Sequence, residues 1–274
     1  MAPSLRLPHL LSLVLLTTGM PMPAQAQSID LGRLIFQGIQ VLQVSNLSDA
    51  QEVALGQQIN QNLALSGDLI INRDPELNNW ITGMGQRLAR LSDRPTLPYV
   101  FQVVEDPAIN AFATMGGYVY ITTGTIAAAQ TEDQVAGVLA HEIAHITSRH
   151  GVKQLQQATT AQVGAQALGL DNSALAAIAF EVGVMRPRSR EDEFEADVQG
   201  VWMLHRAGYD PYALPQMLTN LLGRPRSPEL FSTHPAPQER IARLNQLIST
   251  HNLAPYGGGS PQQRLTTSPE LIWR

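Results

Sequence analysis

The sequence contains no cysteine, and this absence excludes two kinds of chemistry. Among its 274 residues there is no thiol to act as a nucleophile, to ligate zinc or to form a disulfide. A chain of this size can be stable without disulfides, because a domain of about 250 residues buries around 70 to 75% of the surface that its unfolded chain exposes. Any metal site must therefore be built from histidine and carboxylate side chains.

Charge is also scarce, at 15% of the residues, and the 18 Lys and Arg are outnumbered by 23 Asp and Glu. This balance does not suit the phosphate backbone of a nucleic acid, so nucleic acid is not an expected partner. The hydrophobic fraction of 44% is that of a globular protein with a core. The length predicts one large domain or two small ones.

No apolar run is long enough to cross a membrane. The N-terminal run, residues 10–16, is well short of the roughly 18 residues that a span needs. It follows Arg6 and precedes Ala24-Gln25-Ala26, so residues 1–26 are predicted to be a secretory signal peptide. We therefore expect an exported, periplasmic protein with 17 basic residues (18 less Arg6) against 23 acidic ones. Residues 27–250 would form its domain and residues 251–274 a flexible tail, because the Gly257-Gly258-Gly259-Ser260-Pro261 run favours no regular structure.

One short stretch, His141-Glu142-Ile143-Ala144-His145, carries the strongest chemical signal in the chain. Residues four apart lie on one face of a helix, so His141 and His145 can present two imidazole nitrogens to a single metal ion. This is the H-E-x-x-H pattern of zinc sites, in which Glu142 would take a proton from water made acidic by the metal. The stretch predicts two ligands and the base of a catalytic zinc site.

The residues around this stretch favour a helix from Glu132 to about His150. Thr131 and Gln134 have the spacing of a capping box, and an apolar stripe follows at helical spacing: Val135, Val138, Leu139, Ile143 and Ile146. The alternative is that two histidines fell four apart by chance on an ordinary amphipathic helix. A chance match to the full pattern in a chain of this length is rare, on the order of one percent, so the metal site is favoured.

A third ligand is expected from a later, acid-rich helix that begins after Ser189, a good N-cap. Glu193 and Asp197 are four apart and share a face, so one can bind the metal while the other orients a liganding histidine through its free ring nitrogen. Glu191 and Glu195 point elsewhere and are expected to be solvated. The acids of a helix start are usually solvated as a group, but here the two histidines still need a partner.

The rest of the chain predicts a mostly helical α+β protein. Apolar spacing and end signals indicate helices at residues 31–44, 48–65, 75–91 and 238–248, and β-branched and aromatic runs indicate strands at residues 99–105 and 118–123. We expect these strands to form a small antiparallel sheet beside the metal helix. Gly116-Gly117 predicts a hairpin turn. The strand that begins there, with Gly117, Tyr118, Val119 and Tyr120, could also be a sheet edge that binds an extended peptide through its main chain.

Residues 151–187 are low in charge and rich in Ala, Gln and Gly. The simplest interpretation is a pair of helices packed on the domain. The low charge also allows a lid or a peripheral contact with a membrane surface, although the glutamines make the first half too polar for a span.

Taken together, these motifs resemble the HtpX and CAAX-protease-like zinc metallopeptidases, metallopeptidase family 48 of the gluzincin group, and most of all its exported soluble branch of the BepA and LoiP type. The likeness covers residues 47–247. It is carried by Asp74-Pro75-Glu76-Leu77, Asn110-Ala111-Phe112-Ala113, Gly116-Gly117-Tyr118, His141 to His145 with Arg149-His150-Gly151, Glu193 to Asp197, and Thr233-His234-Pro235 with Arg240-Ile241. Two features depart from the family: the membrane-embedded members have transmembrane helices, and the BepA type has a C-terminal repeat domain.

The resemblance implies a zincin-like metallopeptidase domain with one zinc ion per chain. His141, His145 and Glu193 take the family's ligand positions, Glu142 the catalytic position, and Asp197 the position beside a liganding histidine. By the same likeness His234 lies near the metal cleft and could cover the zinc in a resting form. From the residues alone, Thr233-His234-Pro235 could equally be a plain loop.

Two further residues near the site are ambiguous. Arg240 could pair with an acid near the cleft or stabilise transition-state charge. His150 is five positions past His145 and is expected on a different helical face, with a structural role.

The resulting hypothesis is an exported zinc endopeptidase that cleaves misfolded or unassembled envelope proteins. The alternatives are an envelope chaperone or assembly factor with a latent, capped zinc site, and a purely structural zinc domain. A structural site would not need Glu142 or an open fourth ligand position. Unfolded or misassembled proteins are the expected partners, and nothing in the sequence indicates an oligomeric state.

Overall fold

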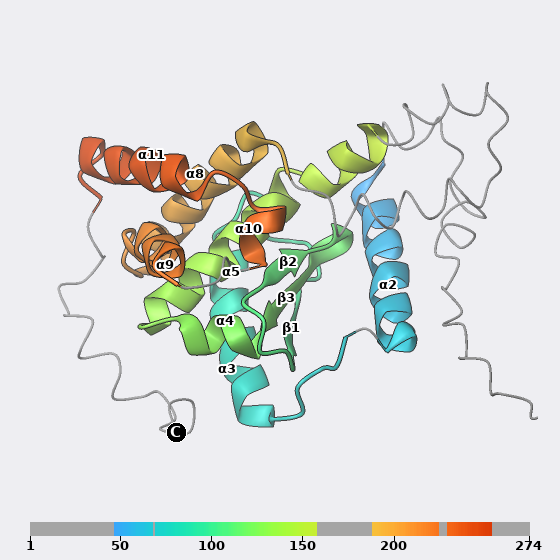
Figure 1. The fold of residues 1–274 in the computed structure, drawn as a ribbon. Helices are drawn as coiled ribbons and strands as arrows, with labels where there is room; N and C mark the ends of the chain where they lie inside the picture. The colour runs from blue at the N-terminus through green and yellow to red at the C-terminus, as the bar shows by residue number, and fades with distance from the viewer. Residues whose placement is uncertain (1–46, 68, 158–187, 225–228, 254–274) are drawn as a thin grey trace, which may run out of the picture.

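The computed structural model describes residues 47–67, 69–157, 188–224 and 229–253 (Figure 1). The predicted signal peptide at residues 1–26 and the predicted helix at residues 31–44 lie outside these ranges. Most of the segment 151–187 and most of the tail 251–274 do so as well. Among the described helices, none combines the length and the apolar content that a membrane span requires.

The mostly helical α+β class is confirmed. In chain order, with the labels of Figure 1, the elements are α2 (Asp49–Ser66), α3 (Pro75–Ala89), β1 (Val100–Val104), β2 (Ala111–Ala113), the 3-10 helix η2 (Met115–Gly117), β3 (Tyr118–Thr122), α4 (Thr123–Ala128), α5 (Glu132–Thr147), α8 (Arg190–Ala207), α9 (Ala213–Leu222), α10 (Leu230–Thr233) and α11 (Pro237–Thr250). The helices predicted within the described residues lie close to their expected bounds. The sequence pattern did not indicate α4, β2, α9 or α10.

The predicted start and stop signals act as expected in α2. The Ser48 side chain accepts a hydrogen bond from the backbone N–H of Gln51, and the Gln51 side chain accepts one from the backbone N–H of Ser48. This reciprocal pair satisfies two backbone donors that the first turn of a helix leaves free. Gly67 ends the helix with φ of +76°, a conformation that glycine adopts without a steric penalty.

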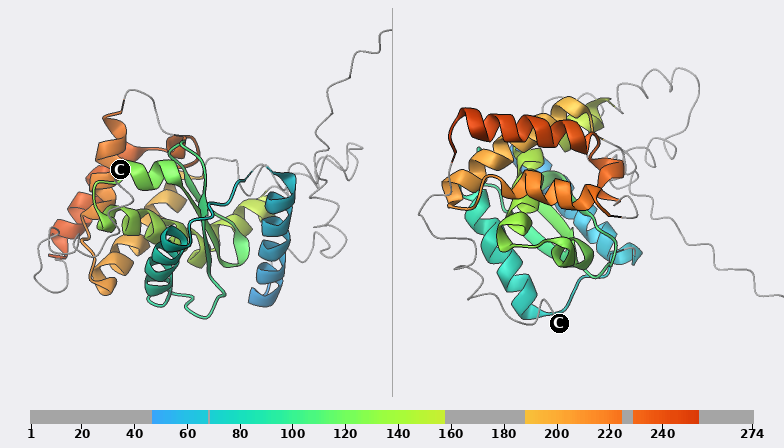
Figure 2. Two further views of the ribbon diagram at one scale, coloured as in Figure 1. Left: turned by 90° about the horizontal axis from the view of Figure 1, so that it is seen from below. Right: turned by 60° about the vertical axis from the view of Figure 1, so that its left-hand side comes forward.

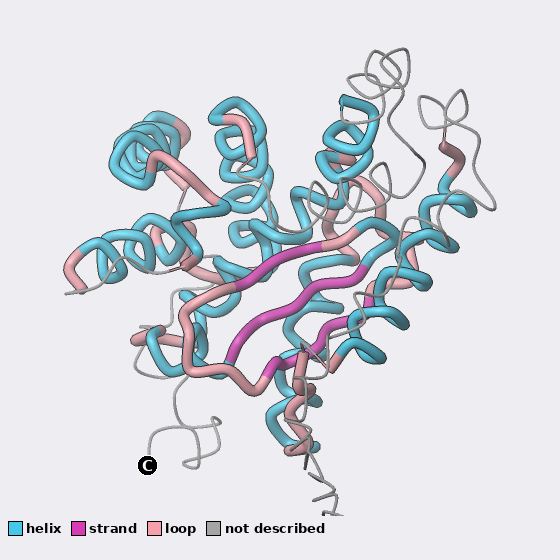
Figure 3. The backbone as a smooth tube through the Cα atoms, turned by 45° about the vertical axis from the view of Figure 1, so that its right-hand side comes forward, coloured by secondary structure: helices cyan, strands magenta, loops and turns pink. Residues whose placement is uncertain are grey.

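The sheet of the described residues is mixed, and β3 is its central strand (Figure 3). Strand β1 pairs with β3 in parallel and β2 pairs with β3 antiparallel. Two expectations are therefore wrong: the sheet is not antiparallel throughout, and the strand with Gly117, Tyr118, Val119 and Tyr120 is not an edge. The physical reason is the short strand β2, which returns through the turn at Gly116-Gly117 and covers one side of β3 while β1 covers the other. The hairpin prediction for this turn is confirmed.

Both faces of the sheet are covered by helices (Figure 2). Alternate residues of β3 point to opposite faces, and all five are buried. Tyr118 and Tyr120 join the apolar cluster formed with α2, whereas Val119 and Ile121 join the main core beside α3 and α5. This packing fixes α5, the helix with the two histidines, directly against the sheet.

Helix α8 packs closely against α5, with α9 and α11 outside this pair (Figure 2). At their crossing, a Cβ on Gly200 would lie 3.3 Å from the backbone nitrogen of His141. The contact is that close because glycine has no side chain. The acidic start of α8 is therefore brought beside the His141 to His145 segment.

Candidate metal centre

Helix α5 holds its functional residues in its second half. Its N-cap is Thr131, whose hydroxyl accepts a hydrogen bond from the backbone N–H of Gln134 at 3.2 Å. This is one half of the predicted capping box; the Gln134 side chain accepts a hydrogen bond from the backbone N–H of Gln130 instead of Thr131. His141, Glu142 and His145 are all buried, with relative exposures of 4%, 0% and 2%. Polar side chains are costly to bury without partners, so such a cluster requires compensating contacts.

Helix α8 supplies two acids to this cluster. Its N-cap Ser189 accepts a hydrogen bond from the backbone N–H of Asp192 at 3.1 Å. Glu193 and Asp197 are buried at 0% and 1% exposure, whereas Glu191 and Glu195 are exposed. Glu193 and Asp197 therefore share the inward face of α8, and Glu191 and Glu195 are solvated as expected.

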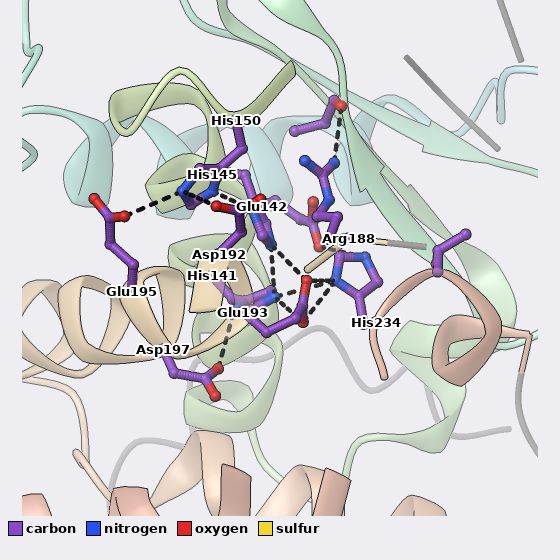
Figure 4. Close-up of polar contacts among 12 residues, drawn as sticks. His141, Glu142, His145, His150, Arg188, Asp192, Glu193, Glu195, Asp197 and His234 are labelled. Carbon is purple, nitrogen blue, oxygen red and sulfur yellow. Dashed lines mark hydrogen bonds and ion pairs between the residues drawn. The ribbon is translucent and has the colours of Figure 1, made fainter. Parts of the chain in front are cut away.

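The structure brings His141, His145 and Glu193 together (Figure 4). The Nε2 atoms of His141 and His145 are 3.0 Å apart. Glu193 Oε2 lies 3.4 Å from His141 Nε2, and Glu193 Oε1 lies 3.3 Å from His145 Nε2. Donors at the corners of a tetrahedron around zinc, each about 2.0 to 2.1 Å from the ion, would be roughly 3.3 Å apart. The spacing of these three donor groups therefore fits a zinc ion.

His234 lies at the fourth corner of this group. It ends the short helix α10 and is 1% exposed. Its Nδ1 is 3.2 Å from His141 Nε2 and 3.1 Å from Glu193 Oε1. Its Nε2 lies 3.4 Å from Glu142 Oε1. The structure thus places His234 in the site, which spacing alone had left open.

Unpartnered polar atoms give a second test of the fit. Within the described residues, both carboxylate oxygens of Glu142 and Nε2 of His234 are buried and accept or donate no hydrogen bond. Apart from the 3.4 Å approach of His234 Nε2 to Glu142 Oε1, these atoms lack the hydrogen bonds that buried polar groups usually make, which is consistent with a site for an ion, water or substrate. The donor set, two imidazoles and a carboxylate with a further imidazole, matches the ligands that zinc prefers. The residues present therefore fit a metal ion.

Asp197 and Arg240 hold the outer side of the cluster. Asp197 Oδ1 is 3.0 Å from His141 Nδ1, the ring nitrogen that faces away from the donor group. Arg240 donates to both oxygens of Asp197, at 2.8 and 2.7 Å, and its third nitrogen lies 2.8 Å from Glu193 Oε2. The expected contact of Asp197 with one of the two histidines is therefore present. Of the two roles considered for Arg240, the structure shows the pairing with acids.

The charges of the cluster shift its pKa values. Burial and the Arg240 charge lower the pKa of His141, but hydrogen bonds to Asp197 and Glu193 outweigh them and raise it to about 9. Burial lowers the pKa of His145 well below its usual value, and burial also lowers that of His150. Burial raises the pKa of Glu193, but the His234 and Arg240 charges prevail and hold it well below the usual range. These charges therefore hold Glu193 ionised beside the rings of His141 and His145.

His150 is closer to the site than its sequence position suggested. Its Nδ1 lies 2.8 Å from His145 Nδ1, and its ring is 1% exposed. The expectation of a different helical face is wrong because α5 ends at Thr147 and Arg149 has φ of +57°, so the chain turns before His150. Its presence in the Arg149-His150-Gly151 motif was the one signal that could have indicated this contact.

The edge strand next to α5 is β2, and no described strand pairs with its outer side. Backbone bonds Thr114 N to Tyr118 O and Thr122 N to Asn110 O show which residues of β2 face β3. By the alternation of antiparallel pairs, the backbone groups of Ala111 and Ala113 point outward instead. The outward Ala113 carbonyl accepts a hydrogen bond at 3.4 Å from Arg188, a buried residue that the sequence analysis did not single out.

Comparison with known proteins agrees with this geometry. The profile of peptidase family M48 matches residues 75–248. The chain is 34% identical over 224 residues to the beta-barrel assembly-enhancing protease of Escherichia coli, covering 74% of this chain and 46% of that protein. It is 31% identical over 267 residues to the protein of the same name from Yersinia pestis, covering 87% of this chain and 53% of that protein.

A mitochondrial relative is also similar. The mitochondrial metalloendopeptidase OMA1 of Schizosaccharomyces pombe is 31% identical over 178 residues, which cover 62% of this chain and 52% of that protein. The chain thus spans about half the length of these curated relatives. Because the family profile covers more than half of this chain and includes every residue of the metal centre, the chain belongs to peptidase family M48.

Proposed function

We propose that this chain is a zinc-dependent endopeptidase that hydrolyses peptide bonds of misfolded or unassembled envelope proteins. The observation that carries the proposal is the buried group of His141, His145 and Glu193, spaced for a tetrahedral ion, with the carboxylate of Glu142, which accepts no hydrogen bond from the described residues, beside it. A structural metal site would not need that carboxylate.

Each side chain has a defined task in this proposal. His141, His145 and Glu193 would hold one zinc ion, which when bound supplies the Lewis acidity that polarises a carbonyl and makes water acidic. Glu142 takes the proton from the attacking water and passes it to the leaving nitrogen. Asp197 holds His141 in place, and Arg240 keeps Asp197 and Glu193 ionised.

Strand β2 is the proposed site of substrate alignment. The backbone groups of Ala111 and Ala113 face away from β3 but are buried, at 0% and 6% exposure, so pairing with an extended peptide requires that the residues covering this edge move. Helix α5 packs against β2, so a peptide on that edge would run alongside the metal centre. This assigns to β2 the role that had been expected for Gly117 to Tyr120.

The position of His234 supports a resting form in which the site is covered. Its Nδ1 stands where a fourth donor would be, so substrate access requires the ring to move. The same observation favours the second candidate function, an envelope chaperone or assembly factor in which this zinc site is latent.

The envelope location is part of the proposal. It is supported by the signal-like pattern of residues 1–26 and by the beta-barrel assembly named in two of the relatives. Unfolded or unassembled polypeptides are the proposed partners.

The test is cleavage of casein, an unfolded protein, by the purified chain, with zinc content measured by atomic emission. Three proteins are compared: the unaltered chain, Glu142→Gln, and Glu191→Gln as a matched control, since Glu191 is an exposed acid on α8. Cleavage by the unaltered chain and the control, lost in Glu142→Gln with zinc retained, is the expected result.

Cleavage that survives in Glu142→Gln would refute the role given to Glu142. Zinc bound by all three proteins without cleavage by any of them would favour the latent chaperone.

A further inference from the structure

His150 contacts the ring nitrogen of His145 that faces away from the metal donors. We propose that His150 is a positioning residue for the metal centre: it accepts a hydrogen bond from Nδ1–H of His145 and thereby directs the Nε2 lone pair of His145 toward the ion. The inference rests on the proposed zinc site and extends it to a residue outside the ligand set. His145 Nδ1 and His150 Nδ1 are 2.8 Å apart, and both rings are buried.

The surroundings of His150 set the direction of this hydrogen bond. Its Nε2 lies 3.4 Å from Glu195 Oε2 and 3.6 Å from Asp192 Oδ1 (Figure 4). A ring nitrogen between two carboxylates carries the proton, because a lone pair there would face negative charge. In a neutral ring the other nitrogen is then an acceptor. His150 Nδ1 therefore accepts, and His145 Nδ1 donates.

This direction determines which nitrogen of His145 is free for a metal. A neutral imidazole has one protonated nitrogen, so a proton held on Nδ1 leaves Nε2 as the acceptor. His145 Nε2 is the atom that lies 3.0 Å from His141 Nε2 and 3.3 Å from Glu193. The hydrogen bond thus pre-selects the tautomer that ligates zinc.

A backbone turn at Arg149 brings His150 into contact with His145. On a continuous helix, His150 would be rotated about 140° from His145, since each residue turns about 100°. Arg149 instead adopts φ of +57°, which is uncommon for a residue with a side chain and is unfavourable by about 1 to 2 kcal/mol. The Arg149 guanidinium is held by an ion pair with buried Glu52 at 3.3 Å. The turn that returns His150 toward His145 is therefore supported from a second element, α2.

The acids behind His150 are already engaged, which argues against a separate cation site there. Asp192 pairs with the ammonium of Lys153, and Glu195 accepts a hydrogen bond from Ser148 at 2.8 Å. They are therefore placed as acceptors for His150. The two liganding histidines are then oriented by different partners, His141 by the carboxylate of Asp197 and His145 by a neutral imidazole.

The experiment compares His150→Phe, which keeps a ring but removes the acceptor, with His150→Asn, whose side-chain oxygen can stand where Nδ1 was. His251→Phe is the matched control, because His251 is an exposed histidine at the end of α11. Zinc affinity is measured by competition with a chromophoric chelator. The tautomer of His145 is read by nitrogen-15 NMR in the zinc-free full chain, in a Glu142→Gln background that prevents self-cleavage.

The expected result is a roughly 10- to 100-fold loss of zinc affinity in His150→Phe, typical of losing a partner that orients a ligand. His150→Asn should keep most of the affinity and His251→Phe all of it. In the zinc-free chain, His145 should carry its proton on Nδ1, and His150→Phe should lose that preference while retaining its circular dichroism spectrum.

Unchanged affinity in His150→Phe, or an equal loss in His150→Asn, would overturn the inference. If His150→Phe does not fold, the NMR spectrum of the zinc-free chain with the native His150 tests the inference by itself. A proton on Nε2 of His145 in that spectrum would overturn the inference. If that chain binds no zinc, the proposed function fails, whereas the tautomer still tests the role of His150.

Discussion

Replacing Arg240 by glutamine should destabilise the metal-free protein strongly. Arg240 is 1% exposed and is the cation that faces two of the buried acids of α8, Glu193 and Asp197. It lies 2.7 Å from Asp197 Oδ1 and 2.8 Å from Glu193 Oε2. Removing one partner of a buried ion pair typically lowers the free energy of unfolding by about 3 to 5 kcal/mol, because the other charge remains buried without compensation.

This magnitude converts into a measurable change in melting temperature. For a domain of 150 to 250 residues, each kcal/mol corresponds to about 2 to 4 °C, so Arg240→Gln should melt roughly 6 to 20 °C lower in the presence of a chelator. Excess zinc should recover part of the difference, since a cation beside Glu193 replaces some of the lost charge.

The assay is thermal unfolding followed by circular dichroism, with and without zinc. The control is Arg190→Gln, because Arg190 is 68% exposed and lies 3.5 Å from Glu239. Exposed ion pairs of this kind contribute at most about 1 kcal/mol. The double variant Arg240→Gln/Asp197→Asn should be less destabilised than the sum of the two single changes. Equal melting temperatures for metal-free Arg240→Gln and the Arg190→Gln control would refute this reasoning.

Three other outcomes are expected. His234→Ala should raise the rate of casein cleavage, by about tenfold for each 1.4 kcal/mol that displacing the His234 ring requires. An unchanged or lower rate in a folded variant would contradict the proposal that His234 covers the site. With a chelator present, the free energy of unfolding should fall as the pH rises from 6.5 to about 9. The pKa of His141 is raised in the folded state, so the stabilisation from protonated His141 is complete below pH 6.5 and is lost as the pH rises through about 9. The loss is on the order of 3 kcal/mol, measurable by urea unfolding, and a flat profile would contradict it. Gly56→Ala should destabilise the protein, because its Cβ would lie 2.0 Å from the Met115 carbonyl oxygen. A Cβ at Gly83 would have nothing within 4 Å, so Gly83→Ala should raise the free energy of unfolding by about 0.4 to 1 kcal/mol in the same assay.

Local features of the site followed from the sequence because they depend on spacing along one helix. The four-residue interval of His141 and His145 places them on one face, and Glu193 and Asp197 share a face of α8 for the same reason. Capping residues such as Thr131 are equally local, since they bond to a backbone N–H three residues away. Helix bounds and the shared faces of these residues could therefore be predicted, whereas the choice of Glu193 over Asp197 as the residue beside both histidines came from the family resemblance.

The order of the strands could not be predicted in the same way. Strand β2 has only three residues, which is too short for a periodic pattern, yet its pairing makes β3 central and transfers the free edge to Ala111–Ala113. Pairing is a contact between distant residues, and its register is decided by the packing of both sheet faces.

The sequence by itself thus determined the chemistry of this protein: a helix with two histidines and a carboxylate, and a second helix with the acids to complete a metal site. Only the tertiary structure decided which more distant side chains complete it. His234 reaches the site through the packing of α10, Arg240 through that of α11, and His150 through the left-handed turn at Arg149. The physical reason is that helical spacing is set by local backbone geometry, whereas these contacts arise from chain reversals and helix packing that no short-range pattern encodes.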